Sequence, residues 1–270
     1  MAKCVAVANQ KGGVGKTTSA INLAASLAYY TQEVLLIDLD PQGNATSGLG
    51  VDKRTVEHTI YDVLTGEKTV PDIIQPTAIE WLELLPSRMD LIGAELELVN
   101  MEQRELRLRQ ALEKFNPVYR YMFLDCPPSL GLLTLNALCA AQSVLIPIQC
   151  EYFAMEGLTQ LMDTIDRVQR SFNPSLEVEG VVMTMYDSRV KLSNDVVGEV
   201  RKVFSGKVYE TVIPRNVRIA ESPSFGKPVL KYDFSSKGAQ AYLKLAREFL
   251  QRQGVTVEET PVKAKAPVAS

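Results

Sequence analysis

The sequence has few of the residues that build metal clusters, disulfides and membrane spans. It contains one histidine, His58, which excludes a histidine-based metal cage, and we expect a structural capping role for it. No apolar run reaches the roughly eighteen residues that predict a membrane-spanning helix. Four cysteines without C-x-x-C spacing lie in or beside apolar runs, where a free cysteine behaves as a small buried hydrophobe. These are Cys4, Cys126, Cys139 and Cys150.

A targeting signal and a strong net charge are also missing. The first residues enter a predicted strand without the apolar region and cleavage site of a signal peptide, so we expect a cytoplasmic protein. The net charge of −3 argues against a globally basic nucleic-acid binder. The charge is uneven, however, because residues 186–231 carry nine Lys/Arg and five Asp/Glu, which makes this stretch +4 and the rest −7. A local basic face of this kind can attract phosphates.

Apolar runs typical of buried parallel strands alternate with helical patterns along most of the chain. This alternation predicts an α/β fold, a doubly wound and mostly parallel sheet with helices on both faces. Residues 1–253 form one predicted domain, and residues 254–270, which lack an apolar period, form a predicted disordered tail. The predicted strands are 4–8, 34–37, 121–124, 144–146, 178–185 and 208–213, and the predicted helices are 16–30, 132–141, 154–172, 193–204 and 236–251.

The rhythm is less regular between residues 43 and 116. Here the patterns predict a short helix over Thr59–Leu64, a strand over Trp81–Leu85 and one long charged helix over Leu91–Phe115. We interpret this segment as an embellishment of the same domain.

The loop after the first predicted strand is rich in glycine and holds two lysines. Its string is Lys11-Gly-Gly-Val-Gly-Lys16-Thr17-Thr18. Glycines let consecutive main-chain N–H groups turn toward phosphate oxygens, and the following helix adds the positive end of its dipole. Lys16 can then reach the β- and γ-phosphates while the Thr17 hydroxyl ligates Mg²⁺. The sequence therefore predicts a site for ATP and Mg²⁺.

This loop departs from the usual G-x-x-x-x-G-K-[ST] spacing, because Gln10 stands where the first glycine would be and Lys11 follows it. It thereby resembles the deviant Walker A motif, K-G-G-x-G-K-[ST], of the MinD/ParA/NifH class. The resemblance implies a nucleotide-sandwich homodimer that forms on ATP binding. In such a dimer Lys11 reaches the partner's triphosphate, as an arginine finger does, and Gly12 lies where the two chains nearly touch.

Two aspartates, Asp38 and Asp40, follow the second predicted strand in the string Ile37-Asp-Leu-Asp-Pro-Gln-Gly-Asn44. The carboxyl ends of parallel strands line the ligand crevice, and alternation places both carboxylates on one side. The string resembles switch I of the ParA/Soj family. That resemblance implies that Asp40 positions or activates the attacking water and that Asp38 orients the magnesium shell. The alternative is that one of them caps the following turn.

Asp125 ends a further apolar run, in Tyr121-Met-Phe-Leu-Asp-Cys-Pro-Pro128. A carboxylate after a hydrophobic strand is the Walker B arrangement, which holds Mg²⁺, usually through water. The two prolines match switch II of the family, which senses the γ-phosphate. The predicted catalytic residues are Lys11, Lys16 and Asp40, the metal-site residues are Thr17, Asp38 and Asp125, and the nucleotide contacts are Lys11, Gly12, Gly13, Val14, Gly15, Lys16, Thr17, Thr18, Met185 and Pro214.

The resemblance to the ParA/Soj family extends from Lys3 to Leu250. It implies an ATPase whose ATP-bound dimer binds double-stranded DNA without sequence specificity on the nucleoid. A ParB-like centromere-binding protein then stimulates hydrolysis and releases the dimer, in chromosome or plasmid segregation. The later strings that look like Soj-type proteins are Glu151-Tyr-Phe-Ala-Met-Glu-Gly157, Thr184-Met-Tyr-Asp187, Val212-Ile-Pro-Arg-Asn-Val-Arg-Ile-Ala-Glu221 and Ser222-Pro-Ser-Phe-Gly-Lys-Pro228.

The same resemblance assigns DNA contact to Arg189 and Arg218, both of which lie in the locally basic stretch. The alternative is that these arginines are solvated or pair with Asp187 and Glu221. Lys191, Arg201 and Lys202 are further candidates from the same stretch.

Two other functions fit parts of the pattern. A MinD-like membrane-associated ATPase needs a C-terminal amphipathic helix, and residues 242–250 do carry an apolar stripe. A terminal helix that covers the sheet predicts the same stripe, and the tail beyond it is polar, so we expect no membrane partner. An iron–sulfur reductase of the NifH type is disfavoured by the placement of the cysteines in or beside strands.

Overall fold

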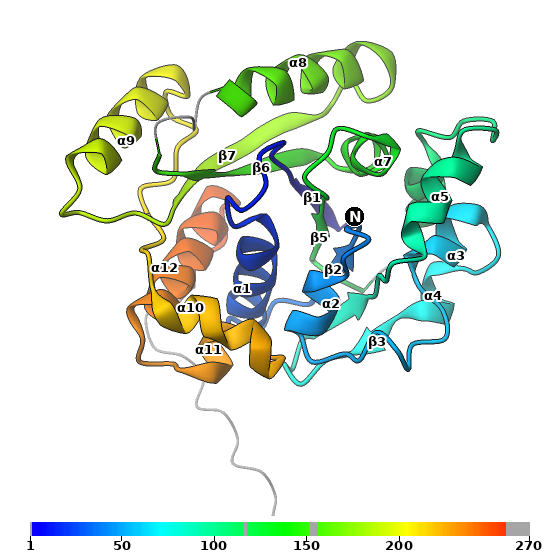
Figure 1. Cartoon of the computed structure of the whole chain (residues 1–270), viewed down its shortest axis with the longest axis horizontal. Coiled ribbons are helices and arrows are strands. Elements are labelled where there is room, and N and C mark those ends of the chain that lie inside the picture. Colours follow the sequence, from blue (N-terminus) through cyan, green and yellow to red (C-terminus); the bar gives the residue numbers. More distant parts are fainter. Residues whose placement is uncertain (1, 116–117, 152–155, 258–270) are drawn as a thin grey trace, which may run out of the picture.

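A computed structural model describes residues 2–115, 118–151 and 156–257 and shows a seven-stranded sheet with helices on both faces (Figure 1). The strand order is β3-β4-β2-β5-β1-β6-β7, and every pair is parallel except β3 with β4. The predicted doubly wound α/β sheet is confirmed. The strands are β1 (Lys3–Val7), β2 (Val34–Asp38), β3 (Gln75–Pro76), β4 (Leu82–Leu85), β5 (Tyr121–Asp125), β6 (Ser143–Gln149) and β7 (Glu177–Thr184).

Helices cover both faces of this sheet, because its central strands are apolar on both sides. On β1, Val5 and Val7 face one buried cluster with α1 and α12, whereas Cys4 and Ala6 face another with α5, α7 and α8. The helices are α1 (Lys16–Tyr29), α2 (Asn44–Gly48), α3 (Ile60–Thr65), α4 (Val70–Ile73), α5 (Leu91–Leu98), α6 (Arg107–Lys114), α7 (Leu132–Ala140), α8 (Glu156–Ser171), α9 (Lys191–Val203), α10 (Val217–Glu221), the 3₁₀ turn η2 (Ser222–Phe225), α11 (Val229–Tyr232) and α12 (Lys237–Arg252).

The register of the central strands brings three strand ends together. Asp125 on β5 pairs with Val7 on β1 and with Asp38 on β2. The loops that follow these strands therefore leave the sheet side by side at its carboxyl edge, which is where ligands bind in open α/β sheets.

The prediction of one long helix over residues 91–115 is wrong, because the chain forms α5 and α6 with a break between them. Gln103 adopts a left-handed φ of 52° in this break. The side chain of Asn136 on α7 donates to the carbonyl of Arg104 and accepts from the N–H of Leu108. It thereby satisfies main-chain groups that a continuous helix would have paired internally.

The predicted strand over residues 208–213 is also wrong. This segment makes only an isolated bridge from Val208 to Val181 and another beyond it, from Pro214 to Tyr186. The N–H groups of Glu210 and Thr211 instead donate to the carboxylate of Glu248 on α12, at 2.8 and 2.9 Å. Because these donors are used by a side chain, a regular ladder beside β7 does not form.

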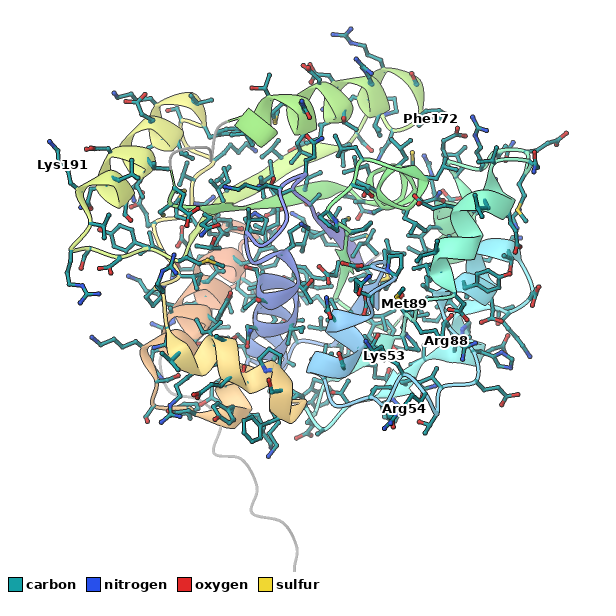
Figure 2. All side chains as sticks on the ribbon, in the orientation of Figure 1. Lys53, Arg54, Arg88, Met89, Phe172 and Lys191 are labelled. Carbon is teal, nitrogen blue, oxygen red and sulfur yellow. The ribbon has the colours of Figure 1, made fainter. Side chains whose placement is uncertain are left out.

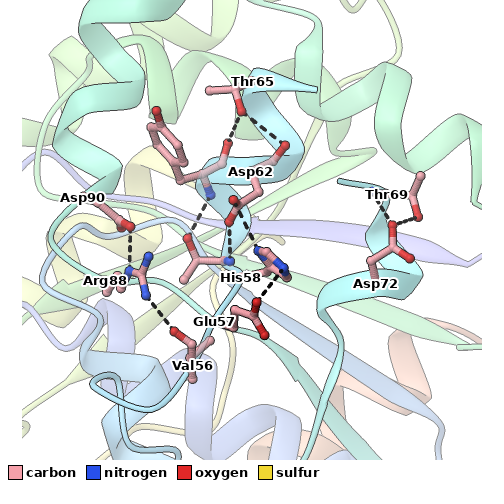
Figure 3. Close-up of polar contacts among 11 residues, drawn as sticks. Val56, Glu57, His58, Asp62, Thr65, Thr69, Asp72, Arg88 and Asp90 are labelled. Atoms are coloured by element: carbon pink, nitrogen blue, oxygen red, sulfur yellow. Dashed lines mark hydrogen bonds and ion pairs between the residues drawn. The ribbon is translucent and has the colours of Figure 1, made fainter. Parts of the chain in front are cut away.

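The only histidine lies at the start of α3. Thr59 is the N-cap of this helix and forms a capping box with Asp62, whose carboxylate accepts from the Thr59 N–H at 2.7 Å. His58 contributes from outside the cap, since its Nδ1 lies 3.5 Å from the other oxygen of Asp62 (Figure 3). The expected structural role of His58 is thus an accessory one, with the capping itself done by Thr59.

All four cysteines are buried and free, as expected for small hydrophobes. Burial raises the pKa of Cys4 to about 12, which suppresses the reactive thiolate form. At the other end of the chain, Val255 and Val257 pack against the cluster that contains α1 and α12. Residues 258–270 of the predicted tail lie outside the described residues.

Candidate nucleotide-binding site

The loop between β1 and α1 is shaped by its glycines. Gly13 and Gly15 adopt left-handed φ angles of 74° and 86°, which disfavour residues with a side chain. Gly15 is also the N-cap of α1, and no side chain caps this helix. The N–H groups of the first turn are therefore available to an anion at the positive end of the helix dipole.

The two lysines of this loop have different surroundings. Lys16 is buried, and its Nζ donates to the carbonyl oxygen of Lys11 at 3.1 Å. Burial lowers the pKa of Lys16, while Asp125, Cys126 and Asp40 act in the opposite direction. The side chain of Lys11 is 34% exposed, and its Nζ lies 3.9 Å from Glu151 at the rim. Lys16 is thus enclosed by the loop, whereas Lys11 is partly exposed and lies near Glu151.

Three aspartates, Asp38, Asp40 and Asp125, lie near one another at the carboxyl edge of the sheet. Asp38 is fully buried and accepts hydrogen bonds from the N–H of Asp40 and from both the N–H and the hydroxyl of Thr46. Burial raises the pKa of Asp38 to about 6, against the opposing effect of these hydrogen bonds. These are the contacts of a residue that anchors the start of α2, and the predicted role of Asp38 toward Mg²⁺ stays a prediction.

Asp125 has no such support. Its carboxylate is fully buried, and neither oxygen makes a hydrogen bond of ordinary geometry within the described residues. Burial raises the pKa of Asp125 well above its usual value, and the neighbouring charges of Asp38 and Asp40 raise it further. The hydroxyl of Thr17 and the ammonium of Lys16 lower the pKa and thus lie close to it. An unsatisfied buried carboxylate of this kind calls for a cation.

The residues around Asp125 fit Mg²⁺. This ion is usually held by one or two carboxylates together with waters and phosphate oxygens, and not by a complete protein cage. Within the described residues no group of three His, Cys, Asp or Glu side chains could hold a metal by itself. Asp125 and the hydroxyl of Thr17 therefore supply the partial ligand set that a nucleotide-bound Mg²⁺ requires.

The loop that carries Asp40 is fixed from two sides. Its carboxylate accepts from the N–H of Gln42 at 2.9 Å, and its carbonyl accepts from the hydroxyl of Ser87 at 2.8 Å. Asp40 is buried beside Lys16, which places it at the phosphate end of the site. Ser87 was not predicted from the sequence, although a polar residue two positions after strand β4 is the signal that would have identified it.

Two of the predicted nucleotide contacts, Met185 and Pro214, lie next to the glycine loop. Thr184, at the end of β7, donates from its hydroxyl to the carbonyl of Val14 at 2.8 Å and so joins β7 to the loop. Met185 follows with a left-handed φ of 51°, and Tyr186 pairs with Pro214. The structure thus brings Met185 and Pro214 together beside the phosphate loop. Thr184 itself was missed by sequence reasoning.

The arginines predicted to contact DNA are exposed and paired within the chain. Arg189 makes a two-point ion pair with Asp187, and its side chain is 85% exposed. Arg218 pairs with Glu221 and with Asp233. The alternative interpretation predicted the pairs of Arg189 with Asp187 and of Arg218 with Glu221. Exposed ion pairs contribute little to stability, however, so each arginine can exchange its carboxylate for another anion. Lys191 begins α9 and extends into solvent (Figure 2). Residues 152–155 of the string that begins at Glu151 lie outside the described residues.

Comparisons with known proteins point to one family. A family model described as an AAA domain matches residues 2–178. The chain is 55% identical to the sporulation initiation inhibitor protein Soj of Bacillus subtilis, over 92% of this chain and 98% of that protein. It is 54% identical to the chromosome partitioning protein ParA of Myxococcus xanthus, over 93% of this chain and 88% of that protein.

Two solved structures share the fold and hold a nucleotide. Cobyrinic acid a,c-diamide synthase of Mycobacterium smegmatis with bound ADP and magnesium has a TM-score of 0.83 at 38% identity, and the match covers 94% of this chain and 96% of that one. The septum site-determining protein MinD of Pyrococcus horikoshii, complexed with Mg-ADP, has a TM-score of 0.78 at 26% identity, covering 94% and 98%.

Proposed function

Because this chain belongs to the ParA/Soj family of chromosome-partitioning P-loop ATPases, we propose that it is an ATP-driven switch that cycles between a free monomer and a DNA-bound dimer. The observation that supports this most directly is the contrast between the two lysines of one loop. Lys16 is buried within the loop, whereas Lys11 is partly exposed and lies 3.9 Å from Glu151. A loop that served only its own nucleotide would have no use for the second cation in that position.

ATP and Mg²⁺ are the proposed ligands of the site. The loop amides and Lys16 hold the phosphates, and Thr17 and Asp125 face the cation. A magnesium ion held beside Thr17 and Asp125 would supply positive charge against the negative charge that develops during phosphoryl transfer. Asp40 lies beside Lys16 at the same edge and orients the attacking water. Transfer to water needs positioning and charge neutralisation, which these groups provide without a covalent nucleophile.

A second copy of the chain completes the site. In the proposed dimer, Lys11 leaves Glu151 and reaches the partner's triphosphate. The exposed pair that it gives up is weak. Gly12 leaves room for the second chain, since a Cβ built on it meets no atom within 4 Å in the single chain.

The dimer is proposed to bind double-stranded DNA through Arg189 and Arg218, without reading sequence. Two copies of each arginine neutralise several phosphates, so affinity falls steeply with salt. A ParB-like centromere-binding protein is the proposed activator of hydrolysis, which returns the chain to the monomer and releases it from the nucleoid.

The testing experiment measures DNA binding by gel shift with ATP, with ADP and without nucleotide, each with and without a candidate ParB protein. DNA binding is expected with ATP but not with ADP or without nucleotide. The binding seen with ATP is expected to fall when the candidate ParB protein is added. Arg189→Glu should abolish DNA binding while ATP-dependent dimerisation, measured by size exclusion, persists. Arg54→Glu is the matched control, because Arg54 makes the same two-point pair with Asp52 and is 88% exposed. DNA binding that survives in Arg189→Glu and Arg218→Glu alike would contradict the assigned surface.

The MinD-like alternative depended on the apolar stripe of the C-terminal helix. In the structure the stripe residues of α12, among them Tyr242, Leu245 and Phe249, are buried against the sheet. None of the helices within residues 2–115, 118–151 and 156–257 has the length and the apolar character that a membrane span requires. Co-sedimentation with liposomes and with DNA, both with ATP, separates the two functions.

A further inference from the structure

A cavity lies between α3, α4 and α6 and shares no lining residue with the nucleotide site. Its volume is about 350 Å³. Ligand pockets in proteins usually have volumes of about 300 to 1,000 Å³, so this cavity has the size of a site for a small molecule. Three of the residues that line it are basic, Lys68, Arg107 and Lys114, and none of the described lining residues is acidic.

The end of α3 holds Arg107 in place at the wall of this cavity. The Nε and Nη2 atoms of Arg107 donate to the carbonyl oxygens of Leu64 and Thr65, at 3.0 and 3.2 Å. Gly66 allows this approach, because a Cβ at that position would lie 2.8 Å from Nη2. Within the described residues Nη1 makes no hydrogen bond. The guanidinium is therefore fixed by two carbonyls and keeps N–H groups for an anion.

The positive charge of the cavity is not neutralised by its surroundings. Within the part of the chain that the structure describes, the three cations make no ion pair. Asp72 accepts from the hydroxyl and the N–H of Thr69 (Figure 3), and these two bonds lower the pKa of Asp72 more than the charge of Lys68 does. Arg109 and Glu113, also on α6, pair with each other at 2.8 Å. The cavity thus favours an anion with two or more charges.

The other part of the lining is apolar. Val63 and Val70 are buried residues of the core, and Pro71, Ala111 and Phe115 line the cavity beside them. A ring can pack against the flat faces of Pro71 and Phe115. An anion without an apolar part would leave this surface in contact with water, and an apolar molecule would leave the cations without a counterion. The lining therefore favours a molecule with both characters.

We propose that this cavity binds a small molecule in which a phosphoryl group is joined to a flat apolar ring. The terminal nitrogens of Arg107 donate to the phosphoryl oxygens, whose geometry a guanidinium matches. Lys68 and Lys114 neutralise the remaining charge, and Phe115 packs on the ring. The site is separate from the glycine loop, so the proposal does not depend on ATP hydrolysis or on DNA binding.

Pyridoxal phosphate is the probe, because it carries a phosphoryl group and an aldehyde on a flat ring. The aldehyde condenses with a lysine amine with loss of water, and borohydride reduces the imine to a stable amine. Mass spectrometry of the digested full-length protein gives the half-maximal probe concentration for each lysine, so labelling of Lys11 or Lys16 does not interfere. We expect Lys68 or Lys114 to be labelled at about tenfold lower concentration than Lys202, whose side chain is 74% exposed.

Arg107→Gln should raise the half-maximal concentration at the preferred lysine by about tenfold or more, as loss of a hydrogen bond to a charged group does. The matched control is Arg104→Gln. Arg104 also donates to a carbonyl at the end of a helix, that of Val99, and pairs with Glu105, but it does not line the cavity. This control should label as the wild type does. Thermal unfolding verifies that both variants keep the fold.

Competition in the wild type tests the ligand class without any variant. Phenyl phosphate should protect the preferred lysine at about tenfold lower concentration than inorganic phosphate, because only phenyl phosphate also covers the apolar lining. Equal protection by inorganic phosphate or by phenol would overturn the proposal, and so would stronger protection by a glutamate-rich peptide. Equal labelling of Lys68, Lys114 and Lys202, or unchanged labelling in Arg107→Gln, would also overturn it.

Discussion

Asp125 makes an unusual prediction about stability. Replacing it by asparagine keeps the size of the side chain and removes a buried negative charge that has no hydrogen-bond donor of ordinary geometry. Asparagine also places polar atoms in this site, so the gain comes from removing a charge that burial disfavours, and an unsatisfied charged group costs more than a neutral one, which costs about 1–3 kcal/mol. We therefore expect Asp125→Asn to raise the free energy of unfolding of the nucleotide-free protein by about 1–3 kcal/mol at neutral pH, although the variant loses a residue of the proposed active site.

The direction of the expected pH dependence follows from the raised pKa of Asp125. The folded-state pKa of Asp125 is raised by burial, so the folded protein binds more protons than the unfolded chain between the two pKa values. The contribution of Asp125 to the free energy of unfolding of the wild type therefore falls as the pH rises between these two pKa values. Acidification restores it. The asparagine variant lacks this titration. The advantage of the variant should thus be largest at about pH 8 and shrink toward about pH 5.

Urea denaturation in EDTA, followed by circular dichroism at both pH values, measures the difference. Asp38, whose pKa is raised to about 6, titrates in both proteins, and its charge contributes to the raised pKa of Asp125, so the measured difference includes the interaction between the two carboxyls. Adding Mg²⁺ and ATP should stabilise the wild type and have a much smaller effect on Asp125→Asn, because the cation loses its carboxylate. A variant that is less stable than the wild type at about pH 8, or a stability difference that does not change with pH, would refute the reasoning.

Three further substitutions test the remaining parts of the site. Lys16→Ala should abolish ATP binding measured by calorimetry, since the only ammonium inside the loop is removed, and retained affinity would refute the loop assignment. Gly12→Val should bind nucleotide with an unchanged Tm, because the position is open in the single chain, but should fail to dimerise in size exclusion with ATP; a stable dimer would contradict this. Asp40→Ala should accumulate the ATP-bound dimer and slow phosphate release, and normal turnover would remove Asp40 from the mechanism.

The parts of the molecule that the sequence predicted well are set by local chemistry. The glycine loop with Lys16 needs only residues adjacent in the chain, and the apolar runs that end at Asp38 and Asp125 form strands wherever they are covered on both faces. The strand register then brings these aspartates together, because parallel strands that pair in phase end at one edge.

The incorrect predictions share a different cause. The break between α5 and α6 depends on Asn136, which lies about thirty residues further along the chain and supplies hydrogen bonds to the broken segment. The missing strand beside β7 depends on Glu248 in α12, which takes the donors that a ladder would use. Local periodicity carries no information about such distant side chains. It therefore predicted one continuous helix over residues 91–115 and a strand over residues 208–213.

The site contains two groups that a single chain does not satisfy. Asp125 is a buried carboxylate that two aspartates, Asp38 and Asp40, disfavour and Lys16 favours. Lys11 is a cation held at the rim by a weak contact with Glu151. Each group lacks what one ligand or one partner brings: Asp125 a metal ion that arrives with the nucleotide, and Lys11 a triphosphate on another chain. In the proposed function, the metal ion that arrives with the nucleotide relieves the first deficit and the partner's triphosphate relieves the second, so binding energy from the nucleotide is coupled to dimerisation. That coupling is what makes the proposed activity a switch.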